Sequence, residues 1–174
     1  ASGIRSGVRK KRPDLALIVA ENGANGAAVF TTNRFQAAPV VLSRAALKKS
    51  AGRVKAVLIN AGCANAITGE PGLEAAKRVR EKTAFALGCP DDQVLLASTG
   101  VIGVLLPERK IVDAIPDAIA RLSASGVEAA SHAILTTDIG PKVVQATFTH
   151  EGRRGRIVGL AKGAGMIHPN MATM

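Results

Sequence analysis

Short apolar runs separated by turn residues account for much of the chain and predict buried strands. Five such strands are predicted, at 14–20, 27–32, 38–42, 54–60 and 93–98. The first two are expected to form an antiparallel hairpin, because the Asn-Gly steps of 21–26 are typical of a turn. Ser43 is expected to cap a short helix over 44–49.

Longer segments with helical spacing follow the strands, at 72–87, 107–122 and 127–135. Gly88 stands where the first helix should end, and glycine is the preferred residue at that position. One face of the second helix carries a row of apolar residues, namely Ile111, Ile115, Ile119 and Leu122. Pro116 interrupts this helix and is expected to kink or split it.

A second hairpin is predicted near the C-terminal end, with strands at 142–149 and 156–162 around a turn at 151–155. Strands therefore come in adjacent pairs, with helices grouped between them. This order favours an α/β protein of the α+β kind, a mixed sheet with helices stacked on it, over a strictly alternating parallel fold. No internal repeat or linker divides residues 1–174, which we take as one unit.

The composition supports a folded protein that is neither membrane-spanning nor exported. Hydrophobic residues make up 47% of 174 residues, enough for the core of one domain, and no apolar run is long enough to cross a bilayer. The N-terminal residues contain no signal core, so we expect a cytoplasmic protein. Cys63 and Cys89 lack CxxC spacing and are expected to be small buried residues, in neither a disulfide framework nor a zinc site.

The net charge of +10 raises the alternative of a basic nucleic-acid-binding module without catalysis. The positive charges are scattered, however, and aromatic residues are 2% of the chain, with no Trp or Tyr to stack on bases. The basic run at 9–12 precedes a strand and is predicted to be a solvated turn. We therefore expect no nucleic-acid partner, and we interpret the excess charge as suited to anionic substrates or to an acidic partner segment.

Common catalytic motifs are absent from the sequence, and no metal site is expected. Gly163-Ala164-Gly165 lacks the third glycine of a dinucleotide loop, where His168 stands instead, and there is no Walker lysine, HExxH or GxSxG. The three histidines lie far apart. What remains are threonines beside glycines or in loops, at 99, 136 and 173. A threonine becomes an effective nucleophile when it begins a chain, because its own α-amine then accepts the hydroxyl proton.

Several segments together resemble the ornithine acetyltransferase family, the self-cleaving glutamate N-acetyltransferases of arginine biosynthesis. The segments that carry the resemblance are 30–40, 60–66, 98–103, 134–138 and 161–174. The resemblance runs from Gly3 to the end of the chain without large gaps. It implies the fold of the amidase-like N-terminal-nucleophile proteins, in which helices sandwich the sheets.

The family resemblance also implies processing and partners. The precursor is expected to cut itself between Ala172 and Thr173, so residues 1–174 correspond to the α chain up to the junction. A β chain of comparable length would begin at Thr173, and two α and two β chains, or more, would assemble. In the present sequence the nitrogen of Thr173 is still peptide-bonded, and Thr173 and Met174 stand beyond the expected boundary.

Matching motif positions imply the site residues: Thr173 as nucleophile, Thr99 and Gly100 as oxyanion hole, and Thr136 and Lys162 as substrate contacts. The implied reaction moves an acetyl group from N-acetylornithine to glutamate through an acetyl-threonine intermediate. No cofactor is implied, and whether acetyl-coenzyme A also donates acetyl groups is left open. The alternative is a related self-processing amidohydrolase or aminopeptidase, in which water takes the place of glutamate.

Overall fold

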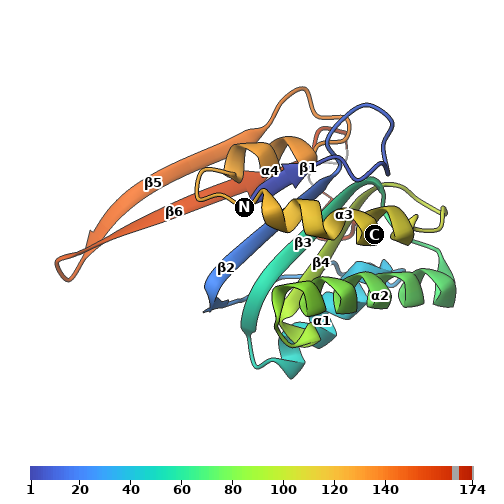
Figure 1. Cartoon of the computed structure of the whole chain (residues 1–174), viewed down its shortest axis with the longest axis horizontal. Coiled ribbons are helices and arrows are strands. Elements are labelled where there is room, and N and C mark those ends of the chain that lie inside the picture. The colour runs from blue at the N-terminus through green and yellow to red at the C-terminus, as the bar shows by residue number, and fades with distance from the viewer. Residues whose placement is uncertain (166–168, 174) are drawn as a thin grey trace.

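A computed structural model describes residues 1–165 and 169–173 and contains a four-stranded mixed sheet (Figure 1). Its strands, in spatial order, are β1 (Ser2–Ile4), β2 (Leu15–Asn25), β3 (Arg53–Cys63) and β4 (Val94–Val101). β1, β2 and β3 are successively antiparallel, whereas β3 and β4 are parallel. The predicted mixed sheet is therefore confirmed. No helix in the described part of the chain is long and apolar enough to cross a membrane.

Helices cover both faces of this sheet unequally, in keeping with the alternation of side chains along β2. Leu15 and Leu17 point into the larger core, which contains residues of α1 (Ala38–Lys49), α2 (Gly69–Leu87) and α3 (Glu108–Ala120). Ala16 points to the opposite face, where it packs on α4 (Val127–Ala133). A short 3-10 helix, Asp91–Gln93, leads into β4. The sheet thus lies between a helical layer and a single short helix.

The region between β2 and β3 differs from its prediction in three ways. β2 continues to Asn25 through the predicted turn, with a register irregularity between Val19 and Ala24, so the hairpin of 14–20 with 27–32 is wrong. The predicted strand at 38–42 is the start of α1, where a proline in the first turn loses no helical hydrogen bond. Ser43 is buried inside α1 and does not cap it. Its hydroxyl donates to the carbonyl of Leu96 and accepts from the N–H of Leu96, both at 2.8 Å.

The remaining helices and the second hairpin follow their predictions more closely. Gly88 ends α2 with a left-handed φ of 63°, as its position indicated. The sequence predicted a kink or split of α3 at Pro116, but α3 continues through this residue, so Pro116 does not split the helix. Pro116 is exposed, while Ile111 and Ile115 hold the buried face of the helix.

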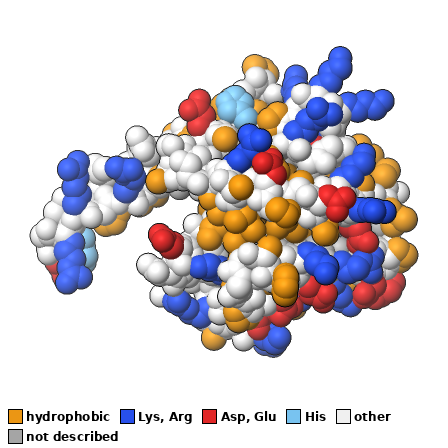
Figure 2. Space-filling model, in the orientation of Figure 1, with side chains coloured by type: hydrophobic (Ala, Val, Ile, Leu, Met, Phe, Trp, Pro, Cys, Tyr) orange, Lys and Arg blue, Asp and Glu red, His pale blue; other side chains and the backbone are white. Residues whose placement is uncertain are grey.

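The second hairpin, β5 (Lys142–His150) and β6 (Arg153–Ala161), is a separate two-stranded sheet. Its register runs from Lys142 opposite Ala161 to His150 opposite Arg153, as a tight hairpin requires. It extends away from the four-stranded sheet as an arm with Lys and Arg side chains along it (Figures 1 and 2). Its base returns to the body, and Lys162 lies at that base immediately after β6.

Candidate active site

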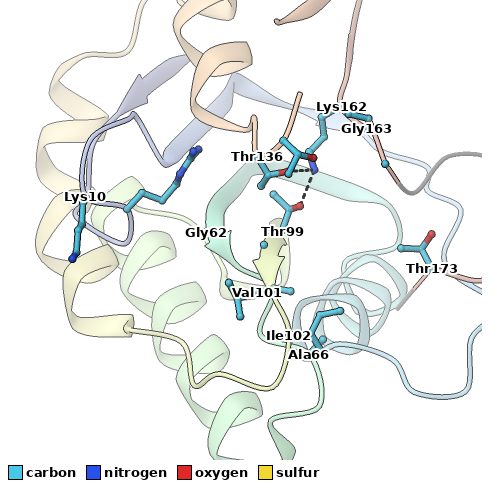
Figure 3. A pocket seen from close by; sticks show the side chains of 16 residues that line it. Lys10, Gly62, Ala66, Thr99, Val101, Ile102, Thr136, Lys162, Gly163 and Thr173 are labelled. Carbon is cyan, nitrogen blue, oxygen red and sulfur yellow. Dashed lines mark hydrogen bonds between the residues drawn. The ribbon is translucent and has the colours of Figure 1, made fainter. Parts of the chain in front are cut away.

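The carboxyl ends of β3 and β4 open onto a cavity of about 810 Å³ (Figure 3). Five regions distant in sequence form its walls: the loop after β1, the end of β3, the end of β4, the segment after α4, and the segment after β6. All five residues assigned to the site from sequence, Thr99, Gly100, Thr136, Lys162 and Thr173, line this cavity. The structure therefore places all five of these residues around one cavity.

Lys162 connects two of the walls through its ammonium group. Its Nζ donates to the hydroxyl of Thr99 and to the hydroxyl of Thr136, each at 2.9 Å. An ammonium group has no lone pair, so both hydroxyls act as acceptors towards it and keep their own protons for a further acceptor. A cation that donates to a hydroxyl oxygen also polarises the O–H bond, so the hydroxyl becomes a stronger hydrogen-bond donor. Thr99 and Thr136 are thus arranged to donate hydrogen bonds to an oxygen in the cavity.

Gly100 lies where β3 and β4 come too close for a side chain. Its φ is +136°, and a Cβ at this position would lie 2.3 Å from the backbone carbon of Gly62. The strand register is also irregular here, between Gly62 and Cys63. Such irregularities at the end of a strand redirect the groups that follow. The geometry therefore requires glycine at position 100, the residue that follows Thr99.

Asp138 connects the segments that carry Thr136 and Lys162, and its role was missed in the sequence. Its fully buried carboxylate accepts the N–H of Gly163 at 2.7 Å, the ammonium of Lys142 at 2.8 Å and the N–H of Thr136 at 3.3 Å. The Lys142 hydrogen bond, and then the two backbone N–H groups, hold the pKa of this carboxyl far below its usual range. Asp138 followed by a lysine four residues later was the available signal.

Arg9 and Lys10 also line the cavity, although their basic run was predicted only as a solvated turn. Lys10 is exposed as predicted, but Arg9 is half-buried and donates from Nη1 to the carbonyl of Leu135 at 2.6 Å. The loop is held by Asp14, whose buried carboxylate accepts the N–H groups of Ser6, Gly7 and Arg9. Among the described residues, no acidic side chain lines the cavity, so it is suited to an anionic ligand.

Thr173 lines the cavity apart from the cluster around Lys162 (Figure 3). Thr173 and Ala172 are both exposed, and their backbone carbonyls contact the segment between β2 and α1. Gly163, with a φ of +143°, begins the glycine-rich stretch that precedes the junction. The rest of this predicted loop, Met166 to His168, and the terminal Met174 lie outside the described residues.

The groups not assigned to chemistry have ordinary environments. Cys63 is buried as expected and Cys89 is half-buried; burial raises the pKa of both thiols, and neither forms a disulfide. His132 and His150 are exposed, and His168 lies outside the described residues. Over 1–165 and 169–173, no three His, Cys, Asp or Glu side chains come together in a way that would hold a metal ion.

Comparison with known proteins identifies the family. The sequence model of the ArgJ family matches residues 1–174. The chain belongs to the ArgJ family. It is 50% identical over 174 residues to the "Arginine biosynthesis bifunctional protein ArgJ" of Caldanaerobacter subterraneus subsp. tengcongensis, covering all of this chain and 43% of that protein. This ArgJ-family chain thus spans about two fifths of the length of that relative.

Two solved structures share the fold of this ArgJ-family chain. The arginine biosynthesis bifunctional protein ArgJ of Bacillus halodurans superposes with a TM-score of 0.90 at 39% identity, over 97% of this chain and 88% of that one. An ornithine acetyltransferase of Mycobacterium tuberculosis, solved with ornithine, gives a TM-score of 0.87 at 35% identity, over 97% and 89%. The resemblance noted in the sequence and the predicted fold class are both confirmed.

Proposed function

We propose that this chain is the α part of an acetyltransferase that moves the acetyl group of N-acetylornithine to glutamate. One observation carries the proposal: Thr99, Thr136 and Lys162 converge by hydrogen bonds in the cavity that Thr173 also lines. The names of the relatives, an arginine biosynthesis bifunctional protein and an ornithine acetyltransferase, support the choice of reaction.

In the proposed reaction Thr173 is the nucleophile. Its Oγ attacks the acetyl carbonyl carbon of N-acetylornithine, and its freed α-amine accepts the hydroxyl proton. The oxyanion accepts hydrogen bonds from the Thr99 hydroxyl and the Gly100 N–H, and a donor of this kind contributes about 3 kcal/mol. The carbon–nitrogen bond then breaks, ornithine leaves with a proton, and an acetyl ester of Thr173 remains. The α-amine of glutamate attacks this ester and carries the acetyl group away.

Lys162 and Thr136 are proposed to bind the substrate. An ammonium group has three N–H donors. Two are used on Thr99 and Thr136, which leaves the third without a partner in the described part of the chain. A carboxylate in the cavity suits that donor, and the cationic Arg9 and Lys10, which also line the cavity, favour a second one. Both amino-acid substrates carry an α-carboxylate.

The proposal includes processing and a partner chain. Self-cleavage between Ala172 and Thr173 would release the α-amine and a β chain, and the two chains would assemble as a heterotetramer or a larger complex. Chain lengths support this processing. The present sequence covers 43% of the C. subterraneus relative but 88% of the chain in the B. halodurans structure. The chain in that structure is therefore much shorter than the C. subterraneus relative. We propose that the enzyme uses no resident cofactor and that acetyl-coenzyme A is at most a further substrate. We also propose a cytoplasmic location.

The test uses the full-length precursor and its Thr173→Ala variant. The wild type should yield two chains by intact mass and transfer labelled acetyl from N-acetylornithine to glutamate. The variant should stay uncleaved and lose transfer by about 1,000-fold or more. A cleaved, active Thr173→Ala protein would overturn the proposal. Release of free acetate with no dependence on glutamate would instead identify the hydrolase alternative.

A further inference from the structure

Residues 31–33, which we call the junction segment, bind the backbone on both sides of the Ala172–Thr173 bond. The N–H of Thr32 donates to the carbonyl of Met171 at 2.6 Å, and the Thr31 and Thr32 hydroxyls each lie 3.0 Å from the same oxygen. The Thr31 hydroxyl also contacts the carbonyl oxygen of Thr173. A segment more than a hundred residues away in sequence therefore holds the junction in a defined position.

Asn33, the third residue of the junction segment, contacts the carbonyl of the Ala172–Thr173 peptide bond. Nδ2 of Asn33 donates to the carbonyl oxygen of Ala172 at 2.9 Å. The orientation of this amide is determined by its two partners. Its Oδ1 accepts the N–H of Phe35 at 2.9 Å, so its NH2 group must face the Ala172 carbonyl. The geometry is that of a hydrogen-bond donor aimed at a carbonyl that is to be attacked.

Contacts with α1 hold the junction segment in place. Arg44 donates from Nη1 to the side-chain carbonyl of Gln36 at 2.8 Å and from Nη2 to the backbone carbonyl of Thr31 at 3.4 Å. Its guanidinium also lies 5.1 Å from the centre of the Phe30 ring. Donors that are fixed before reaction need no reorganisation when charge develops, and this makes them effective.

The backbone before the junction is strained. Residues 169–172 form a tight turn, closed by the N–H of Ala172 on the carbonyl of Pro169 at 3.0 Å. Its two central residues, Asn170 and Met171, have φ values of +51° and +59°. Methionine is unfavourable in this left-handed region, which glycine and asparagine tolerate best. Such strain persists only where surrounding contacts impose it, and the junction segment supplies them.

We propose that the Asn33 side chain is the oxyanion donor of the self-cleavage reaction. The inference relies on the self-cleavage in the proposed function and goes beyond it by assigning a donor to that step. Thr173 Oγ attacks the Ala172 carbonyl carbon and gives up its proton, and the oxyanion forms on the oxygen that Asn33 contacts. The Ala172–Thr173 carbon–nitrogen bond breaks, the nitrogen gains a proton and becomes the α-amine, and an ester remains. Water hydrolyses this ester to the Ala172 carboxylate and the Thr173 hydroxyl.

The Asn33→Asp precursor tests this assignment most directly. The aspartate has nearly the same shape and retains the oxygen that accepts the Phe35 N–H, but it replaces the donor with a negative charge. Asn33→Ala removes the donor without adding charge. Asn22→Asp, at an exposed amide away from the junction, is the control for the same chemical change. Each purified full-length precursor is followed by intact mass over time, and its folding is checked by circular dichroism and thermal melting.

We expect both Asn33 variants to melt cooperatively and to cleave about 100-fold more slowly than wild type, with the control unchanged. A folded Asn33→Ala or Asn33→Asp precursor that cleaves within threefold of the wild-type rate would overturn the assignment. Failure of both variants to fold would make Asn33 a structural residue and would overturn it too. A Thr173→Ala precursor that still cleaves would instead defeat the proposed function, so the two failures are distinguishable.

Discussion

Replacing Asp138 with Asn in the full-length enzyme should both destabilise the protein and weaken the site. The carboxylate accepts three hydrogen bonds, from Lys142, Gly163 and Thr136, with no exposure of its own side chain. Lys142 and Gly163 donate to the same carboxylate oxygen, so an asparagine oxygen in its place keeps both bonds, with a neutral acceptor. The NH2 group of the asparagine then faces the Thr136 N–H, which loses its acceptor. Because the segments of Thr136 and Lys162 meet at Asp138, both proposed substrate contacts should loosen.

The size of the effect follows from the three contacts of Asp138. The substitution exchanges the charged acceptor of the buried Gly163 hydrogen bond for a neutral one, which costs about 1 kcal/mol. Lys142 is half-exposed, so solvent reduces the loss of its ion pair to about 1 kcal/mol or less. The Thr136 hydrogen bond is long, at 3.3 Å, but leaving its N–H without an acceptor costs about 1 kcal/mol. The total is about 2 to 3 kcal/mol, or a melting midpoint lower by about 5 to 10 °C.

The loss should depend on pH in a defined direction. Because the pKa of Asp138 is depressed in the folded protein, its stabilisation is complete above the unfolded value, about 4, and disappears as the pH falls through the folded value. The gap in melting midpoint between wild type and Asp138→Asn should therefore be full near pH 7 and narrow below about pH 4. Asp113→Asn, at an exposed carboxylate, is the control and should change little.

The assays are thermal melting from pH 3 to 8 and acetyl-transfer kinetics at pH 7. We expect a KM for N-acetylornithine that rises about tenfold, since both contacts move, with kcat less affected. An Asp138→Asn enzyme with wild-type melting and wild-type KM would refute the reasoning. So would a gap that widens as the pH falls.

Two further substitutions test the cavity wall. Lys162→Met keeps most of the apolar stem but removes the ammonium, so kcat/KM for acetyl transfer should fall by about 100-fold. A Lys162→Met enzyme with a kcat/KM within threefold of wild type would contradict the proposed role of Lys162 in substrate binding. Gly100→Ala places a Cβ 2.3 Å from the Gly62 backbone at a φ of +136°, and should lower the free energy of unfolding by about 2 to 4 kcal/mol. Gly140→Ala, where a Cβ meets nothing within 4 Å, is its control and should be near neutral.

The sequence predicted the strands that contain a run of apolar residues. The strands at 54–60 and 93–98 are mostly apolar and were found as β3 and β4, with some residues added at their ends. The prediction from sequence failed between β2 and β3, because a short apolar run looks the same at the start of a helix as in a strand. Pro39, which belongs to the first turn of α1, did not resolve the ambiguity.

The residues of the site could be predicted only through the family resemblance. Thr99 and Lys162 are 63 residues apart, and no local pattern says that they touch. The role of Asp138 was harder still to predict, because one of its partners is the backbone N–H of Gly163, 25 residues away. A backbone N–H has no sequence signature. Asn33 falls within 30–40, one of the segments that carry the family resemblance, but its contact with Ala172 depends on the conformation of both chain regions.

The proposed self-cleavage and the proposed acetyl transfer use two separate sets of hydrogen-bond donors, and this separation has a physical reason. The same Thr173 hydroxyl is proposed to attack two carbonyls, first that of Ala172 in its own chain and later that of a substrate in the cavity. Asn33 contacts the oxygen of the first, whereas Thr99 and Gly100 line the cavity that would receive the second. A donor fixed within hydrogen-bond distance of one oxygen cannot also reach an oxygen on another side of the nucleophile. Cleavage must come first, because a peptide nitrogen is not basic, whereas a free α-amine, with an ordinary pKa of about 8, accepts a proton near neutral pH. The junction segment would therefore act once in the life of the molecule, and the Lys162 cluster in every later turnover.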